Sequence, residues 1–326
     1  MNPKHLILTI LAIFAIITIF STAGCVDQEQ PLPIATPEPT QIPTPEPTEQ
    51  PTQITPTPPP DTTQTPPPQV QPGSRLEAHF IDVGQGDAIL IQYNGKNMLI
   101  DAGDRGYGST VVSYLREQSV SRLDYIVATH PHADHIGGMT DVLDAFPVGR
   151  FIDSGNPHTS QTYENMLLAI DEKNIPFSVA ERGQTINLDS ALSIQILNPG
   201  PQLTGDLNED SVVLKMEYGQ VAFLLTGDAG ISTENLMMQH YDLESEILKV
   251  GHHGSRYSSG ATFLAAVSPE VSIIMVGEGN RYGHPTDEVL DRLRVIGSQV
   301  YRTDHHGTIV IATNGVKYTV TSERGA

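Results

Sequence analysis

The chain has 326 residues, a formal net charge of −20 at pH 7 and a single cysteine, Cys25. One cysteine excludes an intramolecular disulfide, and no thiolate is left for a metal site or a covalent nucleophile beyond that position. The acidic charge is unfavourable for a protein that tracks nucleic-acid backbones nonspecifically, because such binding needs Lys and Arg to displace counterions. The chemistry of the chain therefore has to use oxygen and nitrogen groups.

Residues 1–25 have the pattern of an export signal. Lys4 precedes an unbroken apolar run over 6–20, and small residues lead into Cys25. The run is shorter than the ~20 residues of a usual spanning helix, which favours a cleaved signal over a permanent anchor. Gly24-Cys25 resembles the end of a lipoprotein cleavage box. A lipidated Cys25 or an uncleaved signal would each tether the chain at the extracellular face of the cytoplasmic membrane.

Residues 26–74 are rich in Pro, Thr, Gln and Glu, with repeated Thr-Pro pairs such as Thr44-Pro45 and Thr55-Pro56. Such sequence has too little apolar surface to offset the entropy lost on ordering, and its prolines favour extended polyproline II geometry. We predict a disordered linker here. The remaining residues, 75–326, are enough for one domain with a large core.

Apolar segments with a strand pattern alternate with amphipathic segments in 75–326. Strands are expected over 76–83, 88–93, 97–101, 123–129, 192–197, 212–218, 221–226, 247–250 and 271–276. Helices are expected over 110–118, 136–146, 162–171, 233–240, 260–267 and 286–296, several with a capping residue near the start, as in Pro285-Thr286-Asp287-Glu288. Early strands are neighbours and later strands alternate with helices, which indicates a mixed α/β domain.

The run His130-Pro131-His132-Ala133-Asp134-His135 follows the strand predicted over 123–129. Imidazole nitrogens and carboxylate oxygens suit zinc and its first-row neighbours. A short turn can direct alternate side chains at one cation and the next pair at a second. The run therefore predicts a metal site at the end of a strand.

Two further groups follow strands in the same way. Asp228 comes after the strand predicted over 221–226, so its carboxylate should emerge at a strand end. His252 and His253 follow the strand predicted over 247–250, between glycines, and one of them should complete the second metal site. We favour His252, because adjacent side chains of an extended segment point to opposite faces and His252 is nearer the strand. His253 would then contact the substrate, and the reverse assignment stays open.

Five motifs in order resemble one known family. The metal-binding run followed by Ile136-Gly137-Gly138 is similar to the signature of metallo-β-lactamase fold hydrolases. The surrounding motifs resemble the hydrolase domain of ComEC-type DNA-uptake proteins: Phe80-Ile81-Asp82-Val83-Gly84-Gln85-Gly86-Asp87-Ala88, Leu99-Ile100-Asp101-Ala102-Gly103, Leu224-Leu225-Thr226-Gly227-Asp228, Lys249-Val250-Gly251-His252-His253-Gly254-Ser255 and Gly283-His284-Pro285. The resemblance implies a four-layer αββα sandwich of the metallo-β-lactamase type, with the metal site at one edge of its two sheets.

The resemblance also implies a ligand set for two divalent ions. His130 and His132 would bind the first metal, Asp134 and His135 the second, and Asp228 would bridge both.

Many members of the fold supply a third histidine to the first metal, but 186–228 contains none. Asp210 or Asn208 lies where the ComEC-type proteins have a similar polar motif, and His158 is another candidate. Fewer nitrogen ligands make a site more oxygen-rich, so manganese is a rival to zinc. Asp82 and Asp101, next to glycines at early strand ends, are expected to bond loop backbone or to orient a metal-binding histidine.

These features together predict an exported, membrane-tethered metal-dependent hydrolase of phosphodiesters, with DNA as a candidate substrate. Two cations can hold a shared water as hydroxide. Asp134 would orient this nucleophile, and His253 or His284 would protonate or hydrogen-bond the leaving oxygen. Arg256 and Arg281 are candidate substrate contacts, because a guanidinium suits a phosphoryl group. The alternatives are a non-catalytic surface binding protein on the same fold and a hydrolase of lactones, thioesters or β-lactams.

Overall fold

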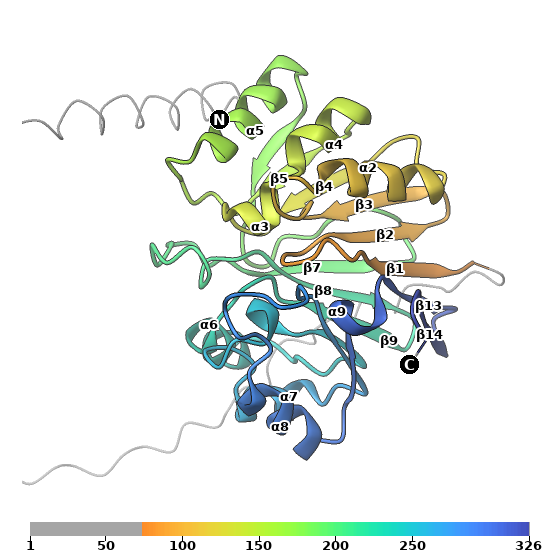
Figure 1. Ribbon diagram of the computed structural model, residues 1–326, viewed down its shortest axis with the longest axis vertical. Helices are drawn as coiled ribbons and strands as arrows, with labels where there is room; N and C mark the ends of the chain where they lie inside the picture. Colours follow the sequence, from red (N-terminus) through yellow and green to blue (C-terminus); the bar gives the residue numbers. More distant parts are fainter. Residues whose placement is uncertain (1–73, 326) are drawn as a thin grey trace, which may run out of the picture. The chain divides into compact units, whose positions relative to one another are not determined.

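The computed structural model describes residues 74–325 (Figure 1). The predicted signal segment, Cys25 and the predicted linker up to residue 73 lie outside the described residues. Within 74–325, no helix is both long enough and apolar enough to cross a membrane. The described chain forms two β-sheets with helices on their outer faces.

The first sheet has eight strands in the order β14-β13-β1-β2-β3-β4-β5-β6. The four strands from β3 to β6 run parallel, and the others pair antiparallel. The strands are β1 (Leu76–Phe80), β2 (Ile89–Tyr93), β3 (Lys96–Ile100), β4 (Tyr125–Ala128), β5 (Phe151–Asp153), β6 (Phe177–Val179), β13 (Ile309–Thr313) and β14 (Tyr318–Ser322). The last two strands therefore return to pair beside the first.

The second sheet has six strands in the order β12-β11-β10-β9-β8-β7. The four strands from β9 to β12 run parallel, while β7, β8 and β9 pair antiparallel. The strands are β7 (Ser193–Asn198), β8 (Val213–Tyr218), β9 (Val221–Leu225), β10 (Ile247–Lys249), β11 (Val271–Ile274) and β12 (Gln299–Arg302). Ligands commonly bind at the carboxyl ends of parallel strands, and here the loops after β9 and β10 start at such ends.

Helices cover the outer face of each sheet, in the upper and lower parts of Figure 1. On the eight-stranded sheet they are α2 (Gly108–Glu117), α3 (Ala133–Ile136), α4 (Met139–Ala145) and α5 (Gln161–Glu172). On the six-stranded sheet they are α6 (Ile231–Met238), α7 (Ala261–Val267) and α8 (Asp287–Val295). The described residues also form two short helical turns, the 3-10 turn η2 (Gly251–Gly254) and α9 (Thr303–His306).

Successive side chains of each strand point to opposite faces of its sheet, and the buried apolar side chains form three cores. In β2, Ile89 and Ile91 belong to the core between the two sheets, whereas Leu90 belongs to the core under α2, α4 and α5. A third core joins α6, α7 and α8 to the six-stranded sheet, with Leu224 of β9 as an example. This period of two is what a strand buried on both faces requires. The predicted αββα sandwich is confirmed.

The predicted helix over 136–146 is instead two helices, α3 and α4, separated at Gly137-Gly138. A Cβ atom at Gly137 would lie 2.2 Å from the Arg105 backbone nitrogen, and one at Gly138 would lie 2.3 Å from the Ala102 oxygen. The glycines are therefore needed for close approach to the loop after β3. Thr286 does stand before α8, but its hydroxyl donates to the Gly254 oxygen rather than capping the helix.

Candidate metal centre

The predicted ligands come from three strand ends. The histidine run follows β4, Asp228 follows β9, and His252-His253 follows β10. The structure brings their ligand atoms together in overlapping clusters. Groups whose ligand atoms all lie within 4.8 Å of one another are His130, His135 and Asp228; Asp134, His135 and His253; and Asp87, Asp101 and His135.

One cluster has the spacing of ligands around a single ion. His135 Nε2 lies 3.3 Å from Asp228 Oδ1, and His253 Nε2 lies 3.3 Å from Asp134 Oδ2 and 3.5 Å from Asp228 Oδ2. Two ligand atoms that are each about 2.1 Å from a tetrahedral ion lie about 3.4 Å apart. These four side chains therefore fit one cation.

A second group of ligand atoms lies on the other side of Asp228. His130 Nε2 is 2.9 Å from His132 Nδ1 and 3.8 Å from Asp228 Oδ2. The two imidazole nitrogens face each other, as two ligands of one ion do. Because Asp228 borders both groups, its carboxylate has the position of a bridge between two cations.

Several buried atoms in the centre have no hydrogen-bond partner within the described chain. They include His135 Nε2, His253 Nε2 and Asp228 Oδ1. Buried polar atoms are normally bonded, so an unpartnered group of two imidazole nitrogens and a carboxylate oxygen calls for a specific reason. A divalent cation bound by all three would satisfy them together. The donor set thus fits the metal that the sequence predicts.

Hydrogen bonds from outside the cluster fix which ring nitrogen faces it. Asp101 Oδ2 lies 2.7 Å from His135 Nδ1, and the same carboxylate accepts from Thr129 N at 2.8 Å. His253 Nδ1 donates to the Met275 backbone oxygen at 2.8 Å. With Nδ1 protonated on both rings, each Nε2 presents its lone pair to the centre. The prediction that Asp101 orients a histidine of the metal run is confirmed.

The segment that carries His252 and His253 is not extended, as the sequence argument assumed. Both residues have left-handed backbone angles, with φ of 47° and 54°, inside the turn η2. Such angles are unusual for residues other than glycine and often mark functional sites. The turn buries His253 among Asp134, His135 and Asp228. It leaves the His252 side chain 28% exposed, with Nε2 3.8 Å from Asp228 Oδ2.

Three residues are candidates for the third ligand of the first metal, and they differ in whether their ligand atoms already have hydrogen-bond partners. Asp210 is buried, and its two oxygens accept from Thr204 N at 2.9 Å, Gly205 N at 3.0 Å and Asn156 Nδ2 at 2.9 Å. Its carboxylate therefore already holds the loop around it, and Asp210 belongs to none of the three clusters.

Asn208 and His158 are placed differently. The ring of His158 lies 6.4 Å from that of His132, and its Nδ1 lies 2.9 Å from Ser160 Oγ. Asn208 Oδ1, in contrast, is a buried oxygen with no partner in the described structure. Its backbone oxygen accepts from Ser211, whose hydroxyl lies 3.4 Å from His130 Nδ1.

Lys249 and Asp87 are parts of the centre that the sequence reasoning missed. The Lys249 ammonium is fully buried, 2.5 Å from Asp87 Oδ2 and 3.7 Å from Asp228 Oδ1, and it donates to the Gly227 oxygen at 2.7 Å. Burial alone would lower the pKa of Lys249, but the carboxylates of Asp87 and Asp228 raise it. A lysine within the apolar run Ile247-Leu248-Lys249-Val250 was the signal available in the sequence.

The field of the carboxylates attracts positive charge to the cluster. Burial alone would lower the pKa of His253, but Asp228, Asp134 and Asp87 raise it to about 9. The pKa of His135 behaves in the same way. Burial alone would lower it, but Asp228 and Asp101 raise it well above its usual value. A ligand nitrogen must lose its proton to bind metal, so a cation would replace this positive charge.

A cavity of about 290 Å³ opens onto the centre. His132, Asp134, His252 and His253 form one part of its wall, and Tyr282 and His284 come from the loop after β11. Burial, followed by the charges of His252 and His253, lowers the pKa of His284 to about 4. His284 is therefore neutral at pH 7, with one ring nitrogen able to donate a hydrogen bond toward a substrate.

Residues 81–278 match the family model described as the metallo-beta-lactamase superfamily. The chain belongs to this superfamily. Metallo-β-lactamase superfamily proteins are generally metal-dependent hydrolases, in agreement with the donor set. The structure of the metallo-beta-lactamase fold protein YhfI from Bacillus subtilis aligns with a TM-score of 0.50 and 11% identity, over 73% of this chain and all of that one. At this identity the likeness concerns the fold alone.

Curated relatives within this superfamily include competence proteins. ComE operon protein 3 of Bacillus subtilis is 30% identical over 252 residues, which covers 72% of this chain and 32% of that protein. Competence protein ComA of Neisseria gonorrhoeae is 33% identical over 241 residues, with the same two coverages. The resemblance to ComEC-type proteins is thereby confirmed. The chain spans about a third of the length of these relatives.

Proposed function

We propose that this protein is a metal-dependent phosphodiesterase that cleaves nucleic acid. The observation that carries the proposal is the buried constellation around Asp228, whose unpartnered nitrogens and oxygen match a dimetal ligand set. The competence-protein relatives support a phosphodiester such as DNA as the substrate. The net negative charge of the chain is compatible with a polyanionic substrate, because bound dications reverse the local field.

We assign the ligands from the geometry of the described residues. His130 Nε2 and His132 Nδ1 would hold the first ion, and Asp228 would be shared between the first ion and the second. Asp134 and His135 Nε2 would hold the second ion.

His253 Nε2, rather than His252, completes the second site, because His253 is buried and its Nδ1 is already bonded to backbone. For the third ligand of the first ion we propose Asn208 Oδ1 in preference to Asp210, whose oxygens are occupied by the loop. Zinc suits this nitrogen and oxygen set, and the two oxygen ligands at each site also admit manganese.

When bound, two divalent ions lower the pKa of a water and neutralise charge that develops on the phosphoryl oxygens. Residues of the cavity wall orient the attacking water and the leaving group. Asp134 lies on the cavity wall, where one of its oxygens can direct the attacking water. His284, neutral at pH 7, donates a hydrogen bond to the leaving oxygen, and the partly exposed His252 lies beside it with ring centroids 5.7 Å apart.

Activity and metal content of the purified full-length chain test this function together. Protein reconstituted with zinc or manganese should hold two ions and should hydrolyse bis-p-nitrophenyl phosphate and single-stranded DNA. Hydrolysis of lactones, thioesters or β-lactams with no phosphodiester cleaved would replace the proposal by another hydrolase. Absence of metal after reconstitution would favour a non-catalytic binding protein.

We also propose that the protein is exported and tethered at the extracellular face of the cytoplasmic membrane. The support is the sequence of residues 1–25, with its apolar run and Cys25. Cell fractionation of the wild type and of Cys25→Ser tests this directly. Lipid tethering predicts release of the variant from the membrane fraction, whereas an uncleaved anchor predicts that both remain bound.

A further inference from the structure

A second cavity, of about 380 Å³, adjoins the one that opens onto the metal centre. Gln85, Ala133, Asp134 and Tyr282 line both of these cavities. Asp104, Asn280 and Arg281 line the second and not the first. A substrate held at the metal centre would therefore extend past Gln85 and Tyr282 into the second cavity. The groups there decide which part of a substrate is recognised beyond the reacting phosphate.

Arg281 is held over the side chain of its neighbour. Its guanidinium carbon lies 5.0 Å from the centre of the Tyr282 ring, and its Nη2 donates to Tyr282 Oη at 2.9 Å. The Tyr282 ring in turn stacks on His284, with centroids 5.9 Å apart and planes at 21°. Stacking and hydrogen bonding restrict this long, exposed side chain, and its other N–H donors have no partner within the described residues. Guanidinium geometry suits a phosphate group.

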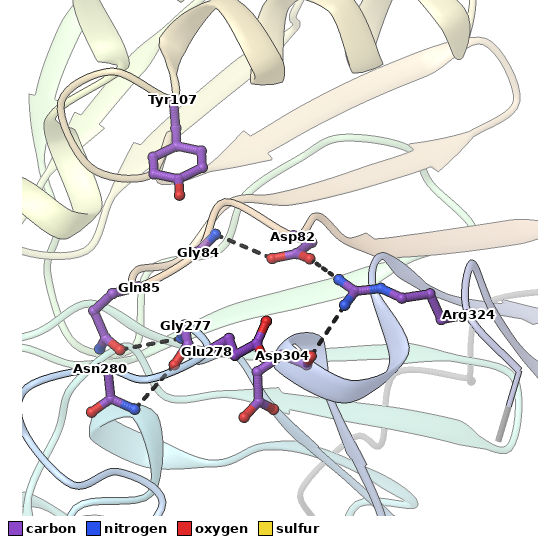
Figure 2. A pocket seen from close by; sticks show the side chains of 9 residues that line it. All are labelled: Asp82, Gly84, Gln85, Tyr107, Gly277, Glu278, Asn280, Asp304 and Arg324. Atoms are coloured by element: carbon purple, nitrogen blue, oxygen red, sulfur yellow. Dashed lines mark hydrogen bonds and ion pairs between the residues drawn. The ribbon is translucent and has the colours of Figure 1, made fainter.

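The loop that carries these residues is fixed by one amide. Asn280 Oδ1 accepts from the backbone nitrogens of Tyr282 and His284, both at 3.1 Å. Asn280 Nδ2 donates to the Gly277 oxygen at 3.1 Å, as Figure 2 shows, and to the His284 oxygen at 2.6 Å. All four bonds close the loop on itself. A recognition group on such a loop keeps its position when substrate arrives.

Gln85, which lines both cavities, carries an unpartnered donor. Its Oε1 accepts from Gly277 N at 3.3 Å, which sets the orientation of the amide (Figure 2). Its Nε2 is buried and has no partner within the described residues. An unpaired buried donor is unfavourable, and a phosphoryl oxygen at the junction would pair it.

The carboxylates that act on Arg281 electrostatically are Asp104 and Asp134. Asp134 is one of the proposed metal ligands, so in the metal-loaded protein its charge is neutralised by the cation. Asp104 Oδ1 accepts from the Arg105 backbone nitrogen at 2.6 Å. The guanidinium itself bonds a phenol rather than a carboxylate, which leaves its charge available for a ligand.

We propose that Arg281 and Gln85, supported by Tyr282, form a subsite for a second phosphate group of the substrate, next to the one that is cleaved. The inference rests on the proposed phosphodiesterase function and names what that site selects. Substrates with a further phosphate along the chain, such as oligonucleotides, are preferred over simple phosphodiesters that carry one phosphate only.

Matched dinucleotides test the subsite. Thymidylyl-thymidine (TpT) has only the scissile phosphate, and pTpTp has the same bond with terminal phosphates on both sides. The wild-type holoprotein should show a kcat/KM for pTpTp at least about tenfold above that for TpT, as one charge-assisted contact implies. Arg281→Ala should lower kcat/KM for pTpTp about tenfold more than for TpT. Arg294→Ala, which removes an exposed arginine of α8 outside both cavities, is the control and should preserve the preference.

Binding separates failure of the subsite from failure of the proposed function. If neither dinucleotide is cleaved, the phosphodiesterase proposal is wrong, and calorimetry of pTpTp and TpT with the metal-loaded full-length protein still tests the subsite. The expected result is tighter binding of pTpTp by the wild type and a loss of that difference in Arg281→Ala. Equal affinity or equal kcat/KM for the two ligands in the wild type would overturn the inference, as would an unchanged preference in Arg281→Ala.

Discussion

Replacement of Lys249 by methionine should destabilise the metal-free protein by about 3–5 kcal/mol. The Lys249 ammonium is fully buried and lies 2.5 Å from Oδ2 of Asp87, a residue that is only 1% exposed. Methionine nearly matches the length of the side chain but removes the ammonium closest to the Asp87 carboxylate, which keeps His253 Nδ1, at 3.4 Å, as a more distant positive neighbour. The cost follows from the loss of that close ion pair, because loss of one partner of a buried pair is far more damaging than loss of both.

Urea unfolding of the metal-free protein measures this effect. Asp87→Asn combined with Lys249→Met should recover most of the stability lost in Lys249→Met, since the double variant removes both partners of the close ion pair. Lys173→Met is the matched control, because the Lys173–Asp144 pair is exposed and such pairs contribute about 0–1 kcal/mol. A loss below about 1 kcal/mol in Lys249→Met, or no recovery in the double variant, would refute the reasoning.

Three further expectations concern the ligands, their orientation and a buried carboxyl. His253→Ala should lose one metal ion per chain by mass spectrometry while His252→Ala keeps two, and the opposite pattern would reverse the ligand assignment. Asp101→Asn should weaken metal binding about 10–100-fold in calorimetry, because the bond that fixes the His135 tautomer changes, and an unchanged affinity would show that this bond does not matter. Burial raises the pKa of Glu234 to about 7 from 4.5, so the native state binds more protons than the unfolded state between these values. The free energy of unfolding should therefore fall as pH rises through this window, and the fall should be smaller in Glu234→Gln. Urea unfolding of both proteins at pH 5 and pH 7.5 measures this difference. The same pH dependence in the two proteins would contradict the expectation.

The long elements and the metal run were predictable because each has a strong local pattern. The period of two in β2 and the histidine run after β4 depend only on neighbours in the sequence. The strands β5 and β6 have three residues each, too short for periodicity to distinguish them from loops. Their strand form depends on pairing, of β5 with β4 and of β6 with β5, which only the folded sheet provides.

The limits of prediction at the site have a similar origin. The preference for His252 as the ligand assumed an extended segment, but His252 and His253 lie in a left-handed turn that buries His253 instead. No local sequence pattern predicts that turn. Lys249 looked like one residue of an apolar strand, and its partner Asp87 is far away in the chain. Asp210 and Asn208 are close in sequence, yet only the structure distinguishes a carboxylate held by loop backbone from a free amide oxygen.

Metal content of Asp228→Asn, measured beside phosphodiester hydrolysis, tests the central claim most directly. The carboxylate lies between the two ligand groups, so its loss removes the negative charge that offsets repulsion between two cations. We predict that at least one ion and most activity are lost while the fold survives, because Asp228 follows a strand end. Exposed His305→Ala is the control and should keep both ions. Two ions and near-normal turnover in Asp228→Asn would contradict the dimetal account.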